Sequence, residues 1–273
     1  MRMSTKRVAD EGTSEPTAKR AAVLEKPAKR AAVLEKPAEA AAGPGSSDAD
    51  AAAEESELQV WSRSLAFSKD EMGKEQLLDA NGTQVMMEWE RPYMVACVDA
   101  LRITSSDDVL EIGFGCAYSA DRIQRAGPRS HTIVECSEPV LERLRAWATD
   151  RPNVRVVAGT WQAELPKLGV FDCVFFDDFG APGLSEREMM QSCASEEYRA
   201  EYTAAPSHFH AFVHIALRWH LKRGGRMTGY LVQSLELKRD DVDVSLRRMP
   251  VAPPAHCHYF DERTAVVPTL VKR

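Results

Sequence analysis

Apolar and polar positions follow different patterns in the two parts of the chain, and the change falls near residue 58. Beyond it, short apolar runs typical of buried strands alternate with stretches in which apolar residues recur at helical spacing. Strands are predicted at residues 108–113, 132–136, 154–158, 171–177 and 226–232. Apolar residues recur at helical spacing through 84–101, and further helices are predicted at residues 118–125, 139–149 and 208–221. The first helix should begin near Pro92, since proline is favoured in a first turn. Strands separated by helices favour a mostly parallel sheet with helices on both faces, so we predict one α/β domain at 58–273.

The first 57 residues contain no aromatic side chain and are rich in alanine, proline, glutamate, lysine and serine. The ten residues KRAAVLEKPA at 19–28 recur identically at 29–38. We interpret 1–57 as a disordered, low-complexity arm, because it carries too little apolar surface to offset the entropy cost of ordering. Its basic pairs at 6–7 and 19–20 leave two interpretations open, a bipartite nuclear signal and ordinary solvated charge.

Composition narrows the class of protein. The chain has 273 residues and a net charge of −6, and we find no basic stripe of the kind that nucleic-acid binders carry. It has no run of roughly 18 apolar residues that could span a membrane, and no apolar core of a secretory signal. Its six cysteines form no CxxC pair, and without a secretory signal we expect reduced thiols and a cytoplasmic location. No carboxylate or cysteine completes a metal site with His208, His210 and His214, so we expect no metal. The sequence does not decide between a monomer and a homodimer.

The segment VLEIGFGCA at 109–117 predicts a cofactor site. A strand runs into Gly113-Phe114-Gly115, where glycines let the backbone approach a ligand closely. Tyr118 stands in place of the third glycine of a dinucleotide fingerprint, which argues against pyrophosphate binding. The next strand ends in Glu135, and an acid there commonly accepts hydrogen bonds from the ribose hydroxyls of an adenosine. Trp161 either closes over the adenine or belongs to the core. The predicted cofactor-binding residues are Gly113, Phe114, Gly115, Cys116, Ala117, Glu135, Cys136, Ser137, Trp161 and Gln162.

The order of these motifs, followed by FDxVxxD and a Gly-Gly turn, is the pattern of Rossmann-like class I methyltransferases, which use S-adenosylmethionine. Within that class the globular part, from about residue 61 to 273, resembles the guanidinoacetate N-methyltransferase family. The resemblance rests on VMMEWERPYM (85–94), VLEIGFGCA (109–117), IVECSEPVLERLRAWA (133–148), GTWQAELPKL (159–168), FDCVFFDDF (171–179) and PPAHCHYF (253–260).

The resemblance implies that Glu90 and Asp177 hold a guanidino group, and that Asp177 also borders the cofactor. It further implies that Met86 and Met94 line the sulfonium end of the cofactor and that Trp61 covers the pocket. Backbone groups of Val232 and Gln233 would hold the carboxylate of the acceptor.

The chemistry of a guanidine agrees with two acids. A guanidinium is planar and positively charged, so paired carboxylates bind it through charge-assisted hydrogen bonds. Its pKa exceeds about 12, so attack on a methyl group requires loss of a proton. We interpret Asp177 as the general base and Glu90 as the orienting acid. Asp178 is adjacent, so the assignment can shift by one residue, although the register from Phe171 favours Asp177.

Two departures from the family lie near the acceptor. The connection at 180–206 is long and acidic, and the stretch between Tyr230 and Met249 is short for a further helix and strand. We expect a small guanidino substrate, guanidinoacetate first, which would yield creatine. Arginine or another guanidino metabolite is the alternative acceptor, and a catalytically silent scaffold is the alternative class of protein.

Overall fold

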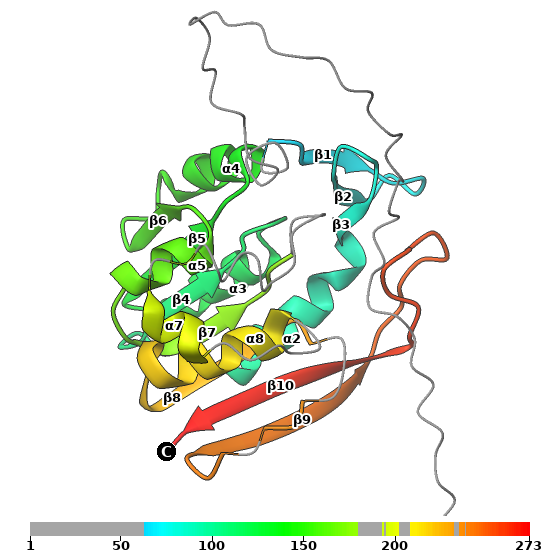
Figure 1. The fold of residues 1–273 in the computed structure, drawn as a ribbon. Helices are drawn as coiled ribbons and strands as arrows, with labels where there is room; N and C mark the ends of the chain where they lie inside the picture. The colour runs from blue at the N-terminus through cyan, green and yellow to red at the C-terminus, as the bar shows by residue number, and fades with distance from the viewer. Residues whose placement is uncertain (1–62, 180–192, 194, 202–207, 232–234, 238) are drawn as a thin grey trace, which may run out of the picture. The chain divides into compact units, whose positions relative to one another are not determined.

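The computed structural model describes residues 63–179, 193, 195–201, 208–231, 235–237 and 239–273 (Figure 1). The arm at 1–57 lies outside this part of the chain, so its predicted disorder stays a prediction. Three of the predicted site residues, Trp61, Val232 and Gln233, also lie outside the described residues.

A seven-stranded sheet forms the centre of the described fold. Its strands are β4 (Asp108–Ile112), β5 (Ser130–Glu135), β6 (Val154–Ala158), β7 (Phe171–Phe176), β8 (Leu221–Gly229), β9 (Val242–Pro250) and β10 (Thr264–Lys272). They lie in the order β6-β5-β4-β7-β8-β10-β9. The first five are parallel, and β10 joins β8 and β9 in antiparallel fashion. From β4 the chain adds β5 and β6 on one side of the sheet and then β7 and β8 on the other, so the strand order switches between β4 and β7. Ligands of open α/β sheets bind at the carboxyl ends of the strands beside such a switch point.

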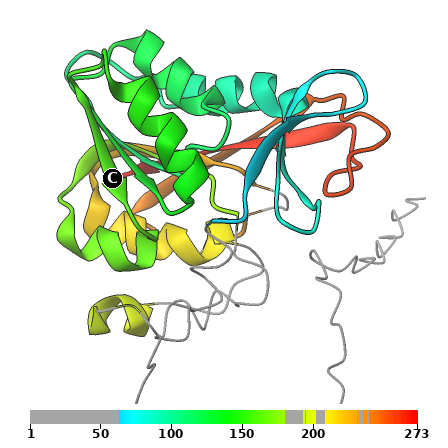
Figure 2. The same ribbon diagram turned by 90° about the horizontal axis from the view of Figure 1, so that it is seen from above.

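Helices cover both faces of this sheet, as predicted (Figures 1 and 2). Residues of α2 (Arg91–Ala100), α3 (Tyr118–Ala126) and α4 (Glu138–Ala148) share one apolar cluster with one face of the sheet. Residues of α5 (Trp161–Glu164), α8 (His208–Ile215) and the π-helical turn η3 (Ala216–His220) share a second cluster with the other face. The remaining short helices are η2 (Leu165–Lys167) and α7 (Glu196–Glu201).

The helix predicted to begin near Pro92 is confirmed, but the residues before it, from 84, are not α-helical although their apolar spacing suited a helix. β1 (Ala66–Lys69), β2 (Glu75–Leu78) and β3 (Gln84–Met87) form a separate three-stranded antiparallel sheet, and η1 (Glu88–Glu90) follows it. The helix α2 begins at Arg91 with proline in its first turn. Pairing of β3 with β2 therefore decides the conformation of residues whose apolar spacing also suited a helix.

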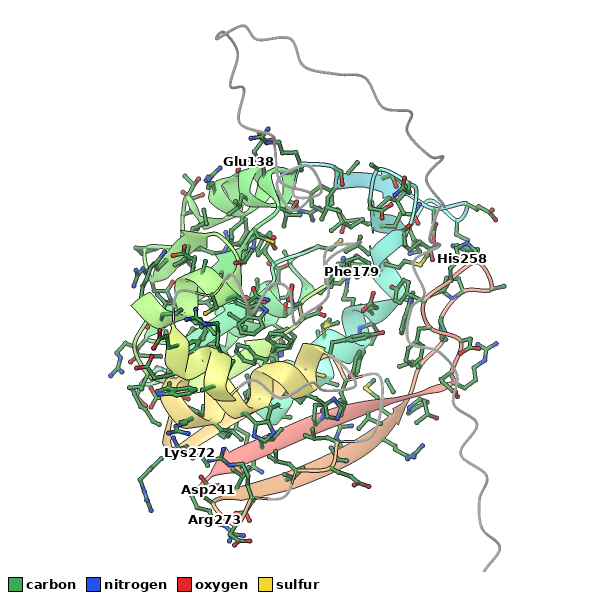
Figure 3. The ribbon with its side chains drawn as sticks, in the orientation of Figure 1. Glu138, Phe179, Asp241, His258, Lys272 and Arg273 are labelled. Carbon is green, nitrogen blue, oxygen red and sulfur yellow. The ribbon has the colours of Figure 1, made fainter. Side chains whose placement is uncertain are left out.

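The C-terminal part of the sheet also differs from the prediction. β8 begins at Leu221, five residues before the predicted start at 226, because the Gly-Gly turn lies inside the strand. Gly224 has a φ of +75°, and the register between β7 and β8 shifts at this point. The short stretch before Met249 holds a full strand, β9, paired with β10 over nine residues. Figure 3 shows Asp241, Lys272 and Arg273 close together where β10 ends.

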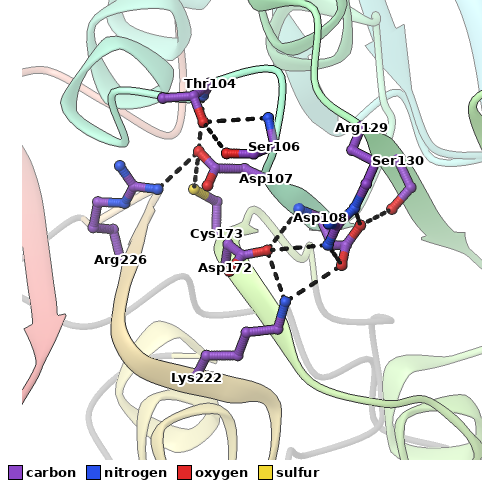
Figure 4. Close-up of polar contacts among 10 residues, drawn as sticks. All are labelled: Thr104, Ser106, Asp107, Asp108, Arg129, Ser130, Asp172, Cys173, Lys222 and Arg226. Carbon is purple, nitrogen blue, oxygen red and sulfur yellow. Dashed lines mark hydrogen bonds and ion pairs between the residues drawn. The ribbon is translucent and has the colours of Figure 1, made fainter.

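The amino ends of the central strands, opposite the glycine turn, carry a network of charges (Figure 4). Lys222 Nζ lies 2.8 Å from Asp172 Oδ2 and 3.3 Å from Asp108 Oδ2. Arg129 Nε donates to Asp108 Oδ1 at 2.8 Å. Within the described ranges, no helix combines the length and apolar character that a membrane crossing requires, and no cluster of side chains suits a metal ion.

Candidate active site

The glycine turn after β4 joins the carboxyl ends of three strands. Gly113 N donates to Val134 O of β5 at 2.9 Å, and Asp177 N, just after β7, donates to Ile112 O at 3.0 Å. Gly113 has a φ of +82°, and a Cβ at this position would overlap the carbonyl of Asp177. Only glycine satisfies both conditions. The backbone of Gly113 therefore contacts the Asp177 carbonyl with no side chain between them.

The second glycine of the turn contacts Met86 of β3. A Cβ on Gly115 would lie 2.8 Å from Met86 Sδ, which also accepts the Cys116 N–H at 3.3 Å. Met86, expected near the cofactor, thus fixes the small sheet to the glycine turn. Met94, expected beside it, is fully buried in the core cluster of α2.

Glu135 ends β5 and lies beside the same turn. Its Oε2 accepts the Phe114 N–H at 2.9 Å, and its Oε1 accepts the N–H groups of Cys136 and Ser137 at 2.8 Å each. Burial raises the pKa of this carboxyl although the three N–H groups oppose the shift. A carboxylate offers about four acceptor positions, so two ribose hydroxyls would have to compete with a backbone donor.

These groups line one pocket of about 500 Å³, counting its open mouth. Six of the predicted site residues line it: Met86, Gly113, Gly115, Glu135, Cys136 and Asp177. Leu65, Leu77, Val85, Val140, Asp178 and Phe179 also line it and were not predicted as cofactor ligands. The structure thus brings Asp177 together with the glycine turn and Glu135, as the sequence predicted.

Trp161 lies in the core rather than over the pocket. Its ring packs edge-on against Phe212 at 5.2 Å, and its exposed fraction is 2%. Its Nε1–H donates to Asp178 Oδ2 at 2.9 Å. Asp178 therefore links this core side chain to the pocket wall. Gln162 is also buried, and its backbone carbonyl accepts a hydrogen bond from the thiol of Cys193 at 2.9 Å.

Glu90 is buried in η1 and is not among the residues that line the pocket. Its Oε1 accepts the Met87 N–H at 3.2 Å and the hydroxyl of Tyr259. Burial raises the pKa of Tyr230 well above its ordinary value, and the charges of Glu90 and Asp177 add to that shift.

The small sheet is fixed to the main fold by Glu75. Arg143 Nη1 donates to its Oε1 at 2.7 Å, and the Tyr118 hydroxyl donates to its Oε2 at 3.2 Å. Tyr118, which replaces the third glycine of a dinucleotide fingerprint, thus binds the strand that helps to wall the pocket. Sequence reasoning missed Glu75 and Tyr259, because each acts through a partner far away in the chain.

Strand order, the glycine turn after β4 and the buried acid after β5 together define a Rossmann-like class I methyltransferase that uses S-adenosylmethionine. The family model described as guanidinoacetate N-methyltransferase matches residues 52–192, and the chain belongs to this family. The bare backbone at Gly113 and Gly115 and the carboxylate of Glu135 in the pocket wall fit such a cofactor.

Curated relatives carry a different name. The protein arginine N-methyltransferase 2 of Aspergillus oryzae is 36% identical over 120 residues, which are 42% of this chain and 28% of the relative. That of Emericella nidulans is 32% identical over 155 residues, 55% of this chain and 34% of the relative. The matched part is thus about a third of the length of these relatives.

Solved structures resemble the chain at low identity. The precorrin-6y C5,15-methyltransferase of Geobacter metallireducens is 15% identical, with a TM-score of 0.43, over 67% of this chain and 88% of its own. TrmN of Thermus thermophilus is 14% identical, with a TM-score of 0.45, over 69% of this chain and 50% of its own.

Proposed function

We propose that the protein methylates a nitrogen of a small guanidino compound held by Glu90 and Asp177. One observation carries the proposal: Asp177 lines the same pocket as the glycine turn and Glu135. Glu90 enters the proposal through the resemblance to the family. When bound, S-adenosylmethionine supplies an electrophilic methyl group on its sulfonium.

The two acids have different tasks in this proposal. Glu90 is fixed by donors from Met87 and Tyr259 and orients the planar cation. Asp177 accepts the proton that the attacking nitrogen must lose as its bond to the methyl carbon forms. Proximity supplies most of the remaining rate, because the pocket holds acceptor and acid in one place.

Guanidinoacetate, giving creatine, is the first candidate acceptor, and the family to which the chain belongs supports it. Arginine in a protein is the second candidate, and the name of the curated relatives favours it. Both carry the same guanidino group, so both acids would serve either acceptor.

A panel of acceptors tests the proposal. Guanidinoacetate, taurocyamine, free arginine and an arginine peptide are each incubated with isotopically labelled S-adenosylmethionine, and products are identified by mass. We expect labelled methyl on guanidinoacetate. Label on the peptide alone would favour the second candidate, and label on no guanidine would overturn the proposal.

The role of Asp177 is tested by Asp177→Asn. Turnover should fall by about 10²–10⁴-fold, the usual contribution of a general base. The affinity for S-adenosylhomocysteine, measured by calorimetry, should stay within about threefold, because the amide keeps the shape of the side chain. The matched variant is Asp178→Asn, whose amide oxygen can still accept from Trp161. A larger loss in this variant than in Asp177→Asn would move the base to Asp178.

A further inference from the structure

The segment 253–260 between β9 and β10 lies against β3 and η1, although more than 160 residues separate them in the chain. Gln84 of β3 binds it twice. Gln84 Nε2 donates to His256 O at 2.9 Å, and His258 N donates to Gln84 Oε1 at 2.8 Å. Figure 3 shows His258 beside the small sheet. Because one planar amide makes both hydrogen bonds, the position of the segment along β3 is fixed.

Aromatic contacts bring the same segment onto η1. The ring of Trp89 lies 5.2 Å from that of Phe260 and 6.1 Å from that of Tyr259. Trp89 is the residue before Glu90. The packing therefore places Tyr259 next to the acid that the proposed function assigns to the guanidino group.

The hydroxyl of Tyr259 donates to Glu90 Oε1, the same oxygen that accepts the Met87 N–H at 3.2 Å. Glu90 is only 3% exposed. An ionised carboxylate is costly at such a buried position unless donors stabilise it. Two donors on one oxygen also restrict the rotation of the carboxylate, so its orientation is set by the protein.

Tyr259 is suited to this task because it keeps its proton. Burial raises the pKa of its phenol far above the ordinary value, and the charge of Glu90 raises it further. The phenol is thus a neutral donor throughout the range in which enzymes work.

We propose that Tyr259 is a positioning residue that orients Glu90, so that segment 253–260 completes the acceptor site. This inference rests on the proposed function, since it gives Tyr259 a role only through Glu90. It assigns the PPAHCHYF motif a task that is distinct from its packing against the small sheet.

The test is a double-mutant cycle with Tyr259→Phe and Glu90→Gln, in which kcat and KM are measured for the acceptor that the panel identifies. Tyr259→Phe keeps the ring beside Trp89 and removes only the hydroxyl. We expect kcat/KM for the acceptor to fall about tenfold, the effect of one hydrogen bond to a charged group. The affinity for S-adenosylhomocysteine should be unchanged. In the Glu90→Gln background the same substitution should change kcat/KM by less than about twofold.

The matched control is His256→Gln, in the same segment. It breaks the contact of His256 Nε2 with Asp70 Oδ2, 3.1 Å apart, without touching Glu90. It should leave acceptor kcat/KM within about twofold of the unmodified enzyme, as expected for an effect on packing alone. A loss equal to that of Tyr259→Phe would reduce the role of Tyr259 to holding the segment in place, and would overturn the inference.

The outcomes separate the inference from the proposed function. Full activity in Glu90→Gln overturns the two-acid site itself. Lost activity in Glu90→Gln together with full activity in Tyr259→Phe overturns the inference alone. Losses that multiply in the double variant also overturn it, because independent effects show that Tyr259 does not act through Glu90.

Discussion

Two features require glycine at position 113: a positive φ and the close approach of the Asp177 carbonyl. Gly113→Ala adds a Cβ that overlaps the carbonyl of Asp177, at a φ of +82° that favours glycine. We expect the affinity for S-adenosylhomocysteine to fall at least about tenfold, because relief of the overlap must displace the turn or Asp177. Gly127→Ala is the control, since Gly127 has a φ of +67° but open space around it. It should cost about 1 kcal/mol of unfolding free energy and leave cofactor affinity intact. Equal affinities in the two variants would contradict the close approach.

Local motifs predicted Gly113, Glu135 and Asp177, because each lies at the carboxyl end of a buried strand. Contacts over long separations were not predictable. Tyr259 and Glu90 lie 169 residues apart, and nothing local marks the tyrosine as a partner of the acid. Trp161 shows a further limit, because an apolar side chain in a core and one in a ligand wall give the same sequence signal.

Among the elements, α7 is held to η3 by a buried hydrogen bond that should respond to pH. His220 Nδ1 lies 2.9 Å from Gly169 O, so Nδ1 carries the proton and Nε2 accepts the hydroxyl of Tyr198. Burial lowers the pKa of His220 below its ordinary 6.5. The contact is therefore fully stable above about pH 6.5 and weakens as the pH falls through the lowered folded pKa, since a protonated ring cannot accept.

Hydrogen exchange of Glu196–Glu201 measures this effect. Protection, corrected for the intrinsic rate, should decrease below about pH 6.5. His220→Gln is the matched variant, because its amide can donate to Gly169 O and accept from Tyr198 but does not titrate. Protection that declines equally in both proteins would refute the role of His220.

The elements that the sequence predicted share one property. β4, β5, β6 and β7 are short apolar runs bounded by helices, and their boundaries agree with the prediction within two residues. β1 and β2 were missed because four-residue strands give little periodic signal. β9 was missed because most of its side chains are exposed, so its pattern lacks the buried alternation of a strand over a core.

In the whole molecule, the alternation of strands and helices predicted the fold class but not the order of the strands. That order depends on which edges pair, and pairing is set by contacts distant in the chain. The order β5-β4-β7 nevertheless explains the site, because it brings Glu135, Gly113 and Asp177 to neighbouring strand ends. The opposite ends of β4 and β7 contain the charged network and no predicted site residue.

This network should set the acid stability of the fold. Arg129 holds the pKa of Asp108 far below its ordinary 3.8, and Lys222 adds to the shift. Burial opposes the lowering of the Asp172 pKa, but the Asp108 N–H and Lys222 outweigh it. Because both folded pKa values are lowered, their contribution to stability is complete above about pH 4 and is lost as the pH falls further.

Lys222→Gln should lower the free energy of unfolding at pH 7 by less than about 1 kcal/mol, since solvent screens this partly exposed lysine. It should also reduce the decline in the free energy of unfolding between pH 7 and about pH 3, because Lys222 contributes to the lowered pKa values of Asp108 and Asp172 that cause this decline. Urea unfolding at a series of pH values measures both effects. Arg273→Gln provides the comparison, because it breaks the exposed pair with Asp243 and should leave the unfolding midpoint unchanged. If Lys222→Gln kept the full acid dependence, Lys222 would have no part in it, and the pair of Arg129 with Asp108 would account for the decline.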